Sequence, residues 1–192
     1  MTNVKQADNI IKIRQEEVQV ILYPNLYLND VNAISIDILK QNNINGIILD
    51  VDNTLIDYDR NISEETILWC ENLKKEGIKF CILSNSNKKD KVSSVAKKLD
   101  VPYFYFAKKP LKGGFKKAKR ILKMPNEQIA VVGDQIFTDV LGSNRCNMFS
   151  ILVNPIKEKD ILITVIKRPI EKLIINSYVK KMTKSGLQKK NK

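Results

Sequence analysis

Residues 46–54 read Gly-Ile-Ile-Leu-Asp-Val-Asp-Asn-Thr, an apolar run followed by two acids one residue apart. Such a run is typical of a strand buried in a parallel sheet. It places Asp50 and Asp52 at the C-terminal end of the strand, where ligands bind in open α/β sheets. One acid can act as nucleophile and metal ligand while the other moves protons. Taken alone, the stretch fits a turn with two solvated acids equally well, so the downstream sequence decides.

Strand-like and helix-like segments alternate along the rest of the chain. We predict strands at 47–51, 79–83, 103–106, 129–132 and 150–153, and helices at 33–40, 63–76, 88–99, 114–122 and 138–144. Alternation of this kind predicts an α/β fold, a Rossmann-like parallel sheet flanked by helices.

Polar residues follow the next two strands at the same predicted edge of the sheet. Ser84 and Asn85 end the second strand, where a hydroxyl and an amide can hydrogen-bond a phosphate. Lys109 follows the third strand and can neutralise a phosphate or a carboxylate. Its neighbour Lys108 is an alternative, and we favour Lys109 because Pro110 restricts the backbone directly after it.

The fourth strand ends in a second pair of acids. Asp134 and Asp139 follow Gly133, a residue type that permits close approach. Their oxygen ligands suit a divalent cation, and Mg²⁺ fits best because the chain has no histidine. We therefore expect Mg²⁺ as the cofactor at this edge.

The histidine and cysteine content limits the kinds of catalytic and metal sites that the chain can form. The 192 residues include no histidine and three widely spaced cysteines, which excludes Ser-His-Asp systems and disfavours disulfide and zinc frameworks. We see no signal peptide and no apolar run long enough to span a membrane. The expected location is the cytoplasm, with peripheral attachment to a membrane as an open alternative.

Positive charge is concentrated near the C-terminus. The formal charge is +12, and residues 156–192 contain eleven Lys or Arg and three acids. This asymmetry suggests an anionic partner, either a membrane surface, nucleic acid or an acidic protein. A codon bias toward Lys, Asn and Ile explains the same composition equally well.

We divide the chain into a helical extension packed on the core (1–44), a core (45–155), a basic amphipathic segment (156–182) and a disordered Lys-rich tail (183–192).

The four polar positions, in this order and spacing, resemble the motifs of the haloacid dehalogenase (HAD) superfamily, subclass III. More narrowly, Asp52-Asn53-Thr54-Leu55, Lys109-Pro110 and the run from Gly133 to Gly142 look like the YqeG family, which is similar to mitochondrial phosphatidylglycerophosphate phosphatases. The resemblance implies a phosphatase in which Asp50 attacks phosphorus and Asp52 protonates the leaving group and then activates water.

The resemblance also implies a phosphate site and a metal site. The expected phosphate-binding residues are Thr54, Ser84, Asn85 and Lys109. The expected metal site contains Asp50, Asp134, Asp139 and Asp52, the last through its backbone carbonyl.

The spacing also bears on the substrate. Between Asp50 and Ser84 lie 33 residues, and between Ser84 and Lys109 lie 24, each gap filled by one predicted helix. We therefore expect no sizeable cap domain and an open site suited to a phosphate on a lipid, a protein or a polynucleotide. The basic segment and the resemblance favour a lipid phosphate such as phosphatidylglycerophosphate. An RNA- or ribosome-associated factor with a vestigial phosphate site and a protein or nucleotide phosphatase stay open, as does the oligomeric state.

Overall fold

The computed structural model describes residues 21–57, 59–157 and 162–190, the last range without side chains at 162–168 and 184–190. The chain divides into two compact units. One combines Met1–Tyr23 with Lys159–Lys192, and the other is Pro24–Glu158. The second unit contains every residue that we expected at the functional site.

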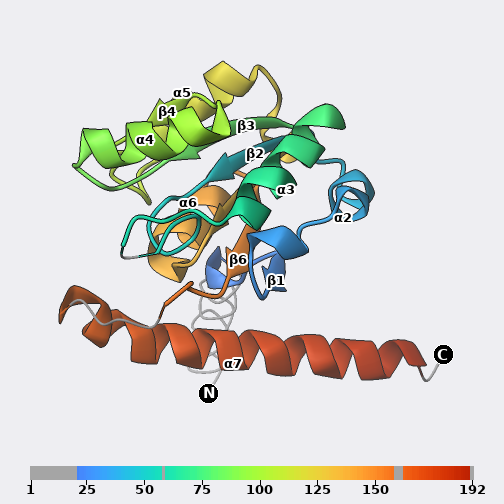
Figure 1. The fold of residues 1–192 in the computed structure, drawn as a ribbon. Coiled ribbons are helices and arrows are strands. Elements are labelled where there is room, and N and C mark those ends of the chain that lie inside the picture. Colours follow the sequence, from blue (N-terminus) through green and yellow to red (C-terminus); the bar gives the residue numbers. More distant parts are fainter. Residues whose placement is uncertain (1–20, 58, 158–161, 191–192) are drawn as a thin grey trace. The chain divides into compact units, whose positions relative to one another are not determined.

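A six-stranded parallel sheet forms the centre of the Pro24–Glu158 unit (Figure 1). The strand order is β1-β6-β5-β2-β3-β4. The strands are β1 (Leu26–Leu28), β2 (Gly46–Leu49), β3 (Lys79–Leu83), β4 (Tyr103–Phe104), β5 (Ile129–Gly133) and β6 (Phe149–Val153). The α/β fold with a parallel sheet flanked by helices is thus confirmed.

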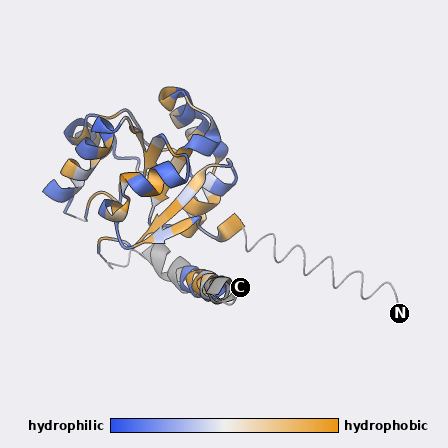
Figure 2. Ribbon diagram, turned by 90° about the vertical axis from the view of Figure 1, so that its right-hand side faces the viewer, coloured by the Kyte–Doolittle hydropathy of each residue, from blue (hydrophilic) through white to orange (hydrophobic). Residues whose placement is uncertain are grey.

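Helices cover both faces of this sheet (Figure 1). On one face lie α2 (Ile36–Gln41), α3 (Glu64–Lys75) and α4 (Lys89–Leu99), and on the other lie α5 (Lys112–Leu122) and α6 (Leu141–Asn144). Alternate residues of β2 serve the two cores, because successive side chains of a strand point to opposite faces. Ile47 and Leu49 belong to the first core and Ile48 to the second. Figure 2 shows the result, with strands of mostly apolar colour and helices of mixed colour.

The central strands end together, which brings their following residues to one edge. Leu49, the last residue of β2, pairs with Ile82 in β3 and with Val132 in β5. The backbone amide of Asp50 still donates to the Val132 carbonyl at 2.9 Å. Asp50 is therefore fixed by the sheet itself, and the loops after β2, β3 and β5 start beside it.

Strand β1 was missed by the sequence analysis. We had assigned residues 1–44 to a helical extension, but Leu26–Leu28 pairs with β6 and extends the sheet at its edge. Three residues are too few to give a periodic signal, and their position depends on tertiary contacts. The amide of Asn25 donates to the Ser150 hydroxyl at 3.0 Å, and the Ser150 amide donates to the Asn25 side chain at 2.8 Å.

Other boundaries moved by a few residues. Strand β4 stops at Phe104 instead of Phe106, because Phe106 adopts a left-handed conformation with φ of +49°. The predicted helix at 138–144 begins earlier, as a π-helical turn η3 (Ile136–Val140) that continues into α6. The N-cap of α3 is confirmed, since the Ser63 hydroxyl accepts from the Thr66 amide at 3.1 Å.

The other unit contains the helix α7 (Leu162–Lys190), which packs on Tyr23. The Tyr23 ring meets the Tyr178 ring edge-on, with centroids 5.7 Å apart, and its hydroxyl lies 2.8 Å from that of Ser177. We expected Pro169 to open a helix and residues 183–192 to be disordered. The helix instead includes Pro169 and continues through Lys190, over Lys, Gln and Leu residues that favour helix.

Two further sequence predictions concern the ends of the chain. The short helix expected within residues 1–20 lies outside the described residues. Among the residues that the structure describes, no helix combines the length and the apolar character needed to cross a membrane.

Candidate active site

A buried lysine joins two buried carboxylates at the C-terminal edge of the sheet. The Nζ of Lys109 donates to Oδ1 of Asp50 and to Oδ1 of Asp139, each at 2.6 Å. Lys109 and Asp50 come from the loops after β4 and β2, and Asp139 comes from the helical turn after β5, so three distant segments converge here. Lys109 and Asp50 are each 6% exposed and Asp139 is 2% exposed. Charges this deeply buried are tolerated only when they are paired and hydrogen-bonded, as they are here.

A third carboxylate completes a cluster that can hold a metal. Oxygen atoms of Asp50, Asp134 and Asp139 lie within 4.8 Å of one another. With these carboxylates ionised, the three negative charges exceed the single positive charge of Lys109 by two, which matches a divalent cation. Carboxylate oxygens are the ligands of hard cations. The donor set on the described residues therefore fits the metal that the sequence predicted.

Gly133 makes room for this cluster. A Cβ at position 133 would lie 2.3 Å from Cγ of Asp139 and 2.5 Å from its Oδ2. No other residue type can occupy the position without moving that carboxylate. The close approach lets Asp139 fold back against the end of β5.

Asp139 is held from several sides. It lies in the π-helical turn η3, an uncommon element that is often found at functional sites. Its Oδ2 accepts from the Thr138 hydroxyl at 3.0 Å and from the Gln135 amide at 3.4 Å. Thr138 was not among our expected site residues, because a hydroxyl next to an acid carries no distinctive sequence signal.

The electrostatics of the centre are dominated by burial. Burial raises the pKa of Asp50 to about 7, against the attraction of Lys109, and the Asp139 and Asp52 charges raise it further. Burial acts to lower the pKa of Lys109, but the carboxylates of Asp139 and Asp50 outweigh it, so this pKa is raised. Lys109 therefore stays charged at neutral pH, and Asp50 holds its proton more tightly than an exposed aspartate does.

The structure shows which of the two adjacent lysines, Lys108 or Lys109, reaches the carboxylates. Lys109 points to the carboxylates, while Nζ of Lys108 lies 5.1 Å from the ring centroid of Phe106. The Asn85 side chain holds the backbone of Lys109 by accepting from its amide at 2.6 Å and donating to its carbonyl at 3.0 Å. We expected Asn85 to bind phosphate, and that stays a prediction. The structure shows that both ends of its amide hydrogen-bond the Lys109 backbone.

The two hydroxyl residues expected at the phosphate site are both buried, Ser84 completely and Thr54 at 3% exposure. The Ser84 hydroxyl accepts from the Ser86 amide at 3.0 Å and keeps its own proton for another acceptor. The Thr54 hydroxyl finds no hydrogen-bond partner among the described residues. An unpartnered buried hydroxyl in the loop after β2 fits a site that takes a polar ligand.

Asp52 differs from Asp50 in its surroundings. Its side chain is 46% exposed and pairs with Lys91 of α4, whose side chain is 13% exposed. The Asp52 carboxylate is not part of the three-carboxylate cluster, so only its backbone carbonyl is left as the metal ligand that we expected. Lys91 was not predicted. Lys91 lies in the first turn of the helix after β3, and this position was the one sequence feature that could have indicated a place at the site. Charged residues are common on such helices, so the feature is not specific.

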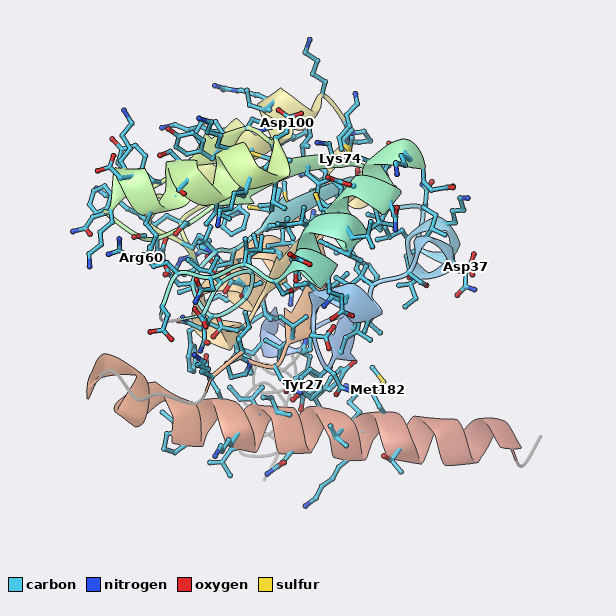
Figure 3. The ribbon with its side chains drawn as sticks, in the orientation of Figure 1. Tyr27, Asp37, Arg60, Lys74, Asp100 and Met182 are labelled. Carbon is cyan, nitrogen blue, oxygen red and sulfur yellow. The ribbon has the colours of Figure 1, made fainter. Side chains whose placement is uncertain are left out.

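The loops around the centre are short. Residues 50–63 connect β2 to α3, and the connection from β3 to β4 contains α4 alone. Figure 3 shows Arg60, in the first of these loops, far from Lys74 and Asp100 at the ends of α3 and α4. The expectation of a site without a sizeable cap domain agrees with these connections.

Comparison with known proteins gives concordant results. The model of the family described as mitochondrial PGP phosphatase matches residues 4–157. The chain is similar to the probable phosphatase YqeG of Bacillus subtilis (strain 168), with 38% identity over 159 residues, which cover 82% of this chain and 92% of that protein.

The chain is also similar to solved structures of bacterial proteins, among them the following two. One is an uncharacterized protein from Listeria monocytogenes serotype 4b, with a TM-score of 0.50, 17% identity, and coverage of 62% of this chain and 85% of that chain. The other is the cobalt-bound form of a deoxy-D-mannose-octulosonate 8-phosphate phosphatase from Haemophilus influenzae, with a TM-score of 0.44, 20% identity, and coverage of 50% of this chain and 61% of that chain. At this level of identity the Listeria protein supports the fold.

Proposed function

The chain belongs to the family described as mitochondrial PGP phosphatase, and from that premise we propose an Mg²⁺-dependent lipid-phosphate phosphatase of the HAD type with Asp50 as nucleophile. It is a phosphatase, so its substrate carries a phosphate group. The observation that carries the proposal is the buried centre in which Lys109 bridges Asp50 and Asp139 beside Asp134.

The nucleophile is assigned from burial and partners. Asp50 is fixed by the end of β2 and lies inside the cluster, where Lys109 neutralises charge. Asp52 is more exposed, outside the cluster, and suited to exchange protons with the leaving group and with water. Asp50, Asp134 and Asp139 would hold Mg²⁺ around this point. The ion, when bound, neutralises charge on the transferred phosphoryl group and orients it.

The proposed reaction has two balanced steps. An Asp50 oxygen forms a bond to phosphorus, the bond from phosphorus to the leaving oxygen breaks, and Asp52 gives that oxygen a proton. Asp52 then takes a proton from water as the water oxygen attacks phosphorus, which releases inorganic phosphate and regenerates the Asp50 carboxylate. Lys109, Ser84 and Thr54 would bind the phosphoryl oxygens throughout.

The proposal that the substrate is a lipid phosphate is supported by the short connections at the C-terminal edge of the sheet. Short loops surround the centre, which leaves access for a phosphate on a large object. The description of the matching family names a PGP phosphatase. We also keep the prediction that the basic C-terminal segment contacts a membrane. In α7, Ile170 and Leu173 are 50% and 69% exposed, next to the exposed Lys172.

Phosphate release from a panel of substrates tests the function. The panel contains phosphatidylglycerophosphate in mixed micelles, a nucleoside monophosphate, a phosphopeptide and an aryl phosphate, each with and without Mg²⁺. We expect turnover that needs Mg²⁺, prefers the lipid and falls at least about a thousandfold in Asp50→Asn. Asp100→Asn makes the same substitution at the exposed, left-handed end of α4 and should retain activity. A strong preference for the nucleotide or the peptide would reject the lipid, and activity that survives Asp50→Asn would reject the nucleophile.

A further inference from the structure

The loop that carries Lys109 also carries exposed apolar side chains. Between β4 and α5, Tyr105 is 42% exposed and Phe106 and Leu111 are each 55% exposed, while Lys109 between them is buried. We call residues 105–112, which are this loop and the first residue of α5, the docking loop. Large apolar side chains grouped on one exposed loop are a typical mark of an interaction surface.

The backbone of the docking loop is held in place by hydrogen bonds. The amide of Phe106 donates to the Ser86 carbonyl at 2.8 Å, and the Ala107 amide donates to the Ser84 carbonyl at 2.9 Å. Phe106 has a φ of +49°, a left-handed conformation that is rare for a bulky residue. Such a conformation persists only where the surroundings enforce it, so the outward presentation of Phe106 is built into the fold.

The stretch of sequence around the docking loop carries only positive charge. Residues 101–126 contain eight Lys or Arg and no acid. Lys108 and Lys112 are exposed within the loop, and Lys116 is exposed in the helix that follows. Lys108 lies over the Phe106 ring, so charge and apolar surface occupy the same place. This combination complements a surface that is anionic outside and apolar below, as an acidic lipid bilayer is.

We propose that the docking loop inserts into an anionic lipid surface and so positions the active site on it. The inference rests on the proposed function and deepens it, because the same loop aims Lys109 at Asp50 and Asp139. Because β2, β3 and β4 are parallel, the loops that follow β2 and β4 leave the sheet at the same edge, so docking through one brings the other to the lipid headgroups. The rings of Tyr105 and Phe106 could also stack on bases, so single-stranded RNA is the competing partner in the test below. We favour a membrane because the aliphatic side chain of Leu111 is as exposed as Phe106 and gains from burial in an apolar layer but not from stacking.

Flotation with vesicles tests the docking loop in the full-length protein. Vesicles of phosphatidylcholine with about one-third phosphatidylglycerol are compared with pure phosphatidylcholine. The test variant is Phe106→Asn with Leu111→Gln, which removes apolar surface without changing charge and keeps a residue that tolerates positive φ at 106. The matched control is Leu68→Gln in α3, where the leucine is 54% exposed. A second variant, Lys108→Gln with Lys112→Gln, is matched by Lys97→Gln with Lys98→Gln in α4.

We expect the wild-type protein and both controls to float with the anionic vesicles and each docking-loop variant to lose at least about tenfold in partitioning. Flotation that is unchanged in the docking-loop variants would overturn the proposal. So would variants that lose only binding to a single-stranded RNA or only self-association in sedimentation velocity. Hydrolysis of a soluble aryl phosphate, measured in parallel, separates the two ideas. Flotation through this loop without turnover would reject the proposed function, and turnover without flotation would reject the docking loop.

Discussion

The side chains on the two sides of the docking loop differ in burial and in the number of partners that hold them. On the inner side, Lys109 is enclosed between two carboxylates at 2.6 Å, and its backbone is fixed by Asn85. On the outer side, Phe106 and Leu111 face solvent at 55% exposure. The inner side needs one geometry and one residue type, whereas the outer side needs only apolar and positive character. Substitutions inside should therefore act on chemistry and stability, and substitutions outside on partitioning to a surface.

The largest effect is expected at the inner lysine. Lys109→Met leaves Asp50 and Asp139 buried without their cation, and breaking a buried pair in this way costs about 3–5 kcal/mol of unfolding free energy. Urea denaturation with and without Mg²⁺ measures it, and added Mg²⁺ should restore part of the loss by neutralising the carboxylates. If stability stayed within about 1 kcal/mol of wild type, the pair would not be buried as described.

Gly133→Ala tests the packing around the buried Asp139 carboxylate without changing a charge. The new Cβ would lie 2.3 Å from Cγ of Asp139, so the carboxylate must move, and overpacking of this kind costs about 1–3 kcal/mol. Mg²⁺ affinity should fall with stability. Gly113→Ala is the control, because nothing lies within 4 Å of its Cβ and a glycine inside a helix is worse than alanine by about 0.5–1 kcal/mol. Thermal unfolding of both variants tests this contrast, and destabilisation of equal size would contradict it.

The pH dependence of Mg²⁺ binding reports on Asp50. Burial raises its pKa to about 7 in the metal-free protein, and a carboxyl must lose its proton to bind the ion. The apparent affinity should therefore increase with pH up to about 7 and then level off, with up to about a tenfold loss per pH unit below that point. Calorimetry across this range, in buffers of different ionisation enthalpy, also counts the released proton. Affinity independent of pH between 5.5 and 8 would show that Asp50 is already ionised.

The smallest effect on stability is expected at the rim of the site. Lys91→Met removes a pair in which Asp52 is 46% exposed, so unfolding free energy should change by less than about 1 kcal/mol. Activity should fall more, by about tenfold on an alkyl phosphate, because Asp52 loses the group that holds it and proton transfer matters most for poor leaving groups. An aryl phosphate with a good leaving group should be less sensitive. The control is Lys98→Met, an exposed lysine of the same helix, and equal losses on both substrates would argue against a positioning role.

The sequence predicted the parts of this molecule that depend on local pattern. The strands around Asp50 and Asp134 are continuous apolar runs, and their register follows from the parallel sheet, so the meeting of both acids was foreseeable. Strand β1 was not, because its three residues are specified by pairing with β6.

Within the site, side-chain partners were harder to predict than positions. Asn85 stands where the motif places it, yet its amide is used to hold Lys109, and that depends on how the loop after β4 returns to β3. Lys91 meets Asp52 across 39 residues of sequence, and such a contact leaves no periodic trace. The exposure of Phe106 also depends on a left-handed backbone that the apolar run Tyr103–Phe106 conceals.

The most direct test of the account is to trap the covalent intermediate. The protein is mixed with substrate and Mg²⁺, quenched in acid, reduced with borohydride and mapped by peptide mass spectrometry. An aspartyl-phosphate at Asp50 is reduced to homoserine, so we expect homoserine at position 50 in the wild-type protein and not in the Asp50→Asn variant. Turnover without modification at position 50, or with modification at Asp52 instead, would contradict the assignment of Asp50 as the nucleophile.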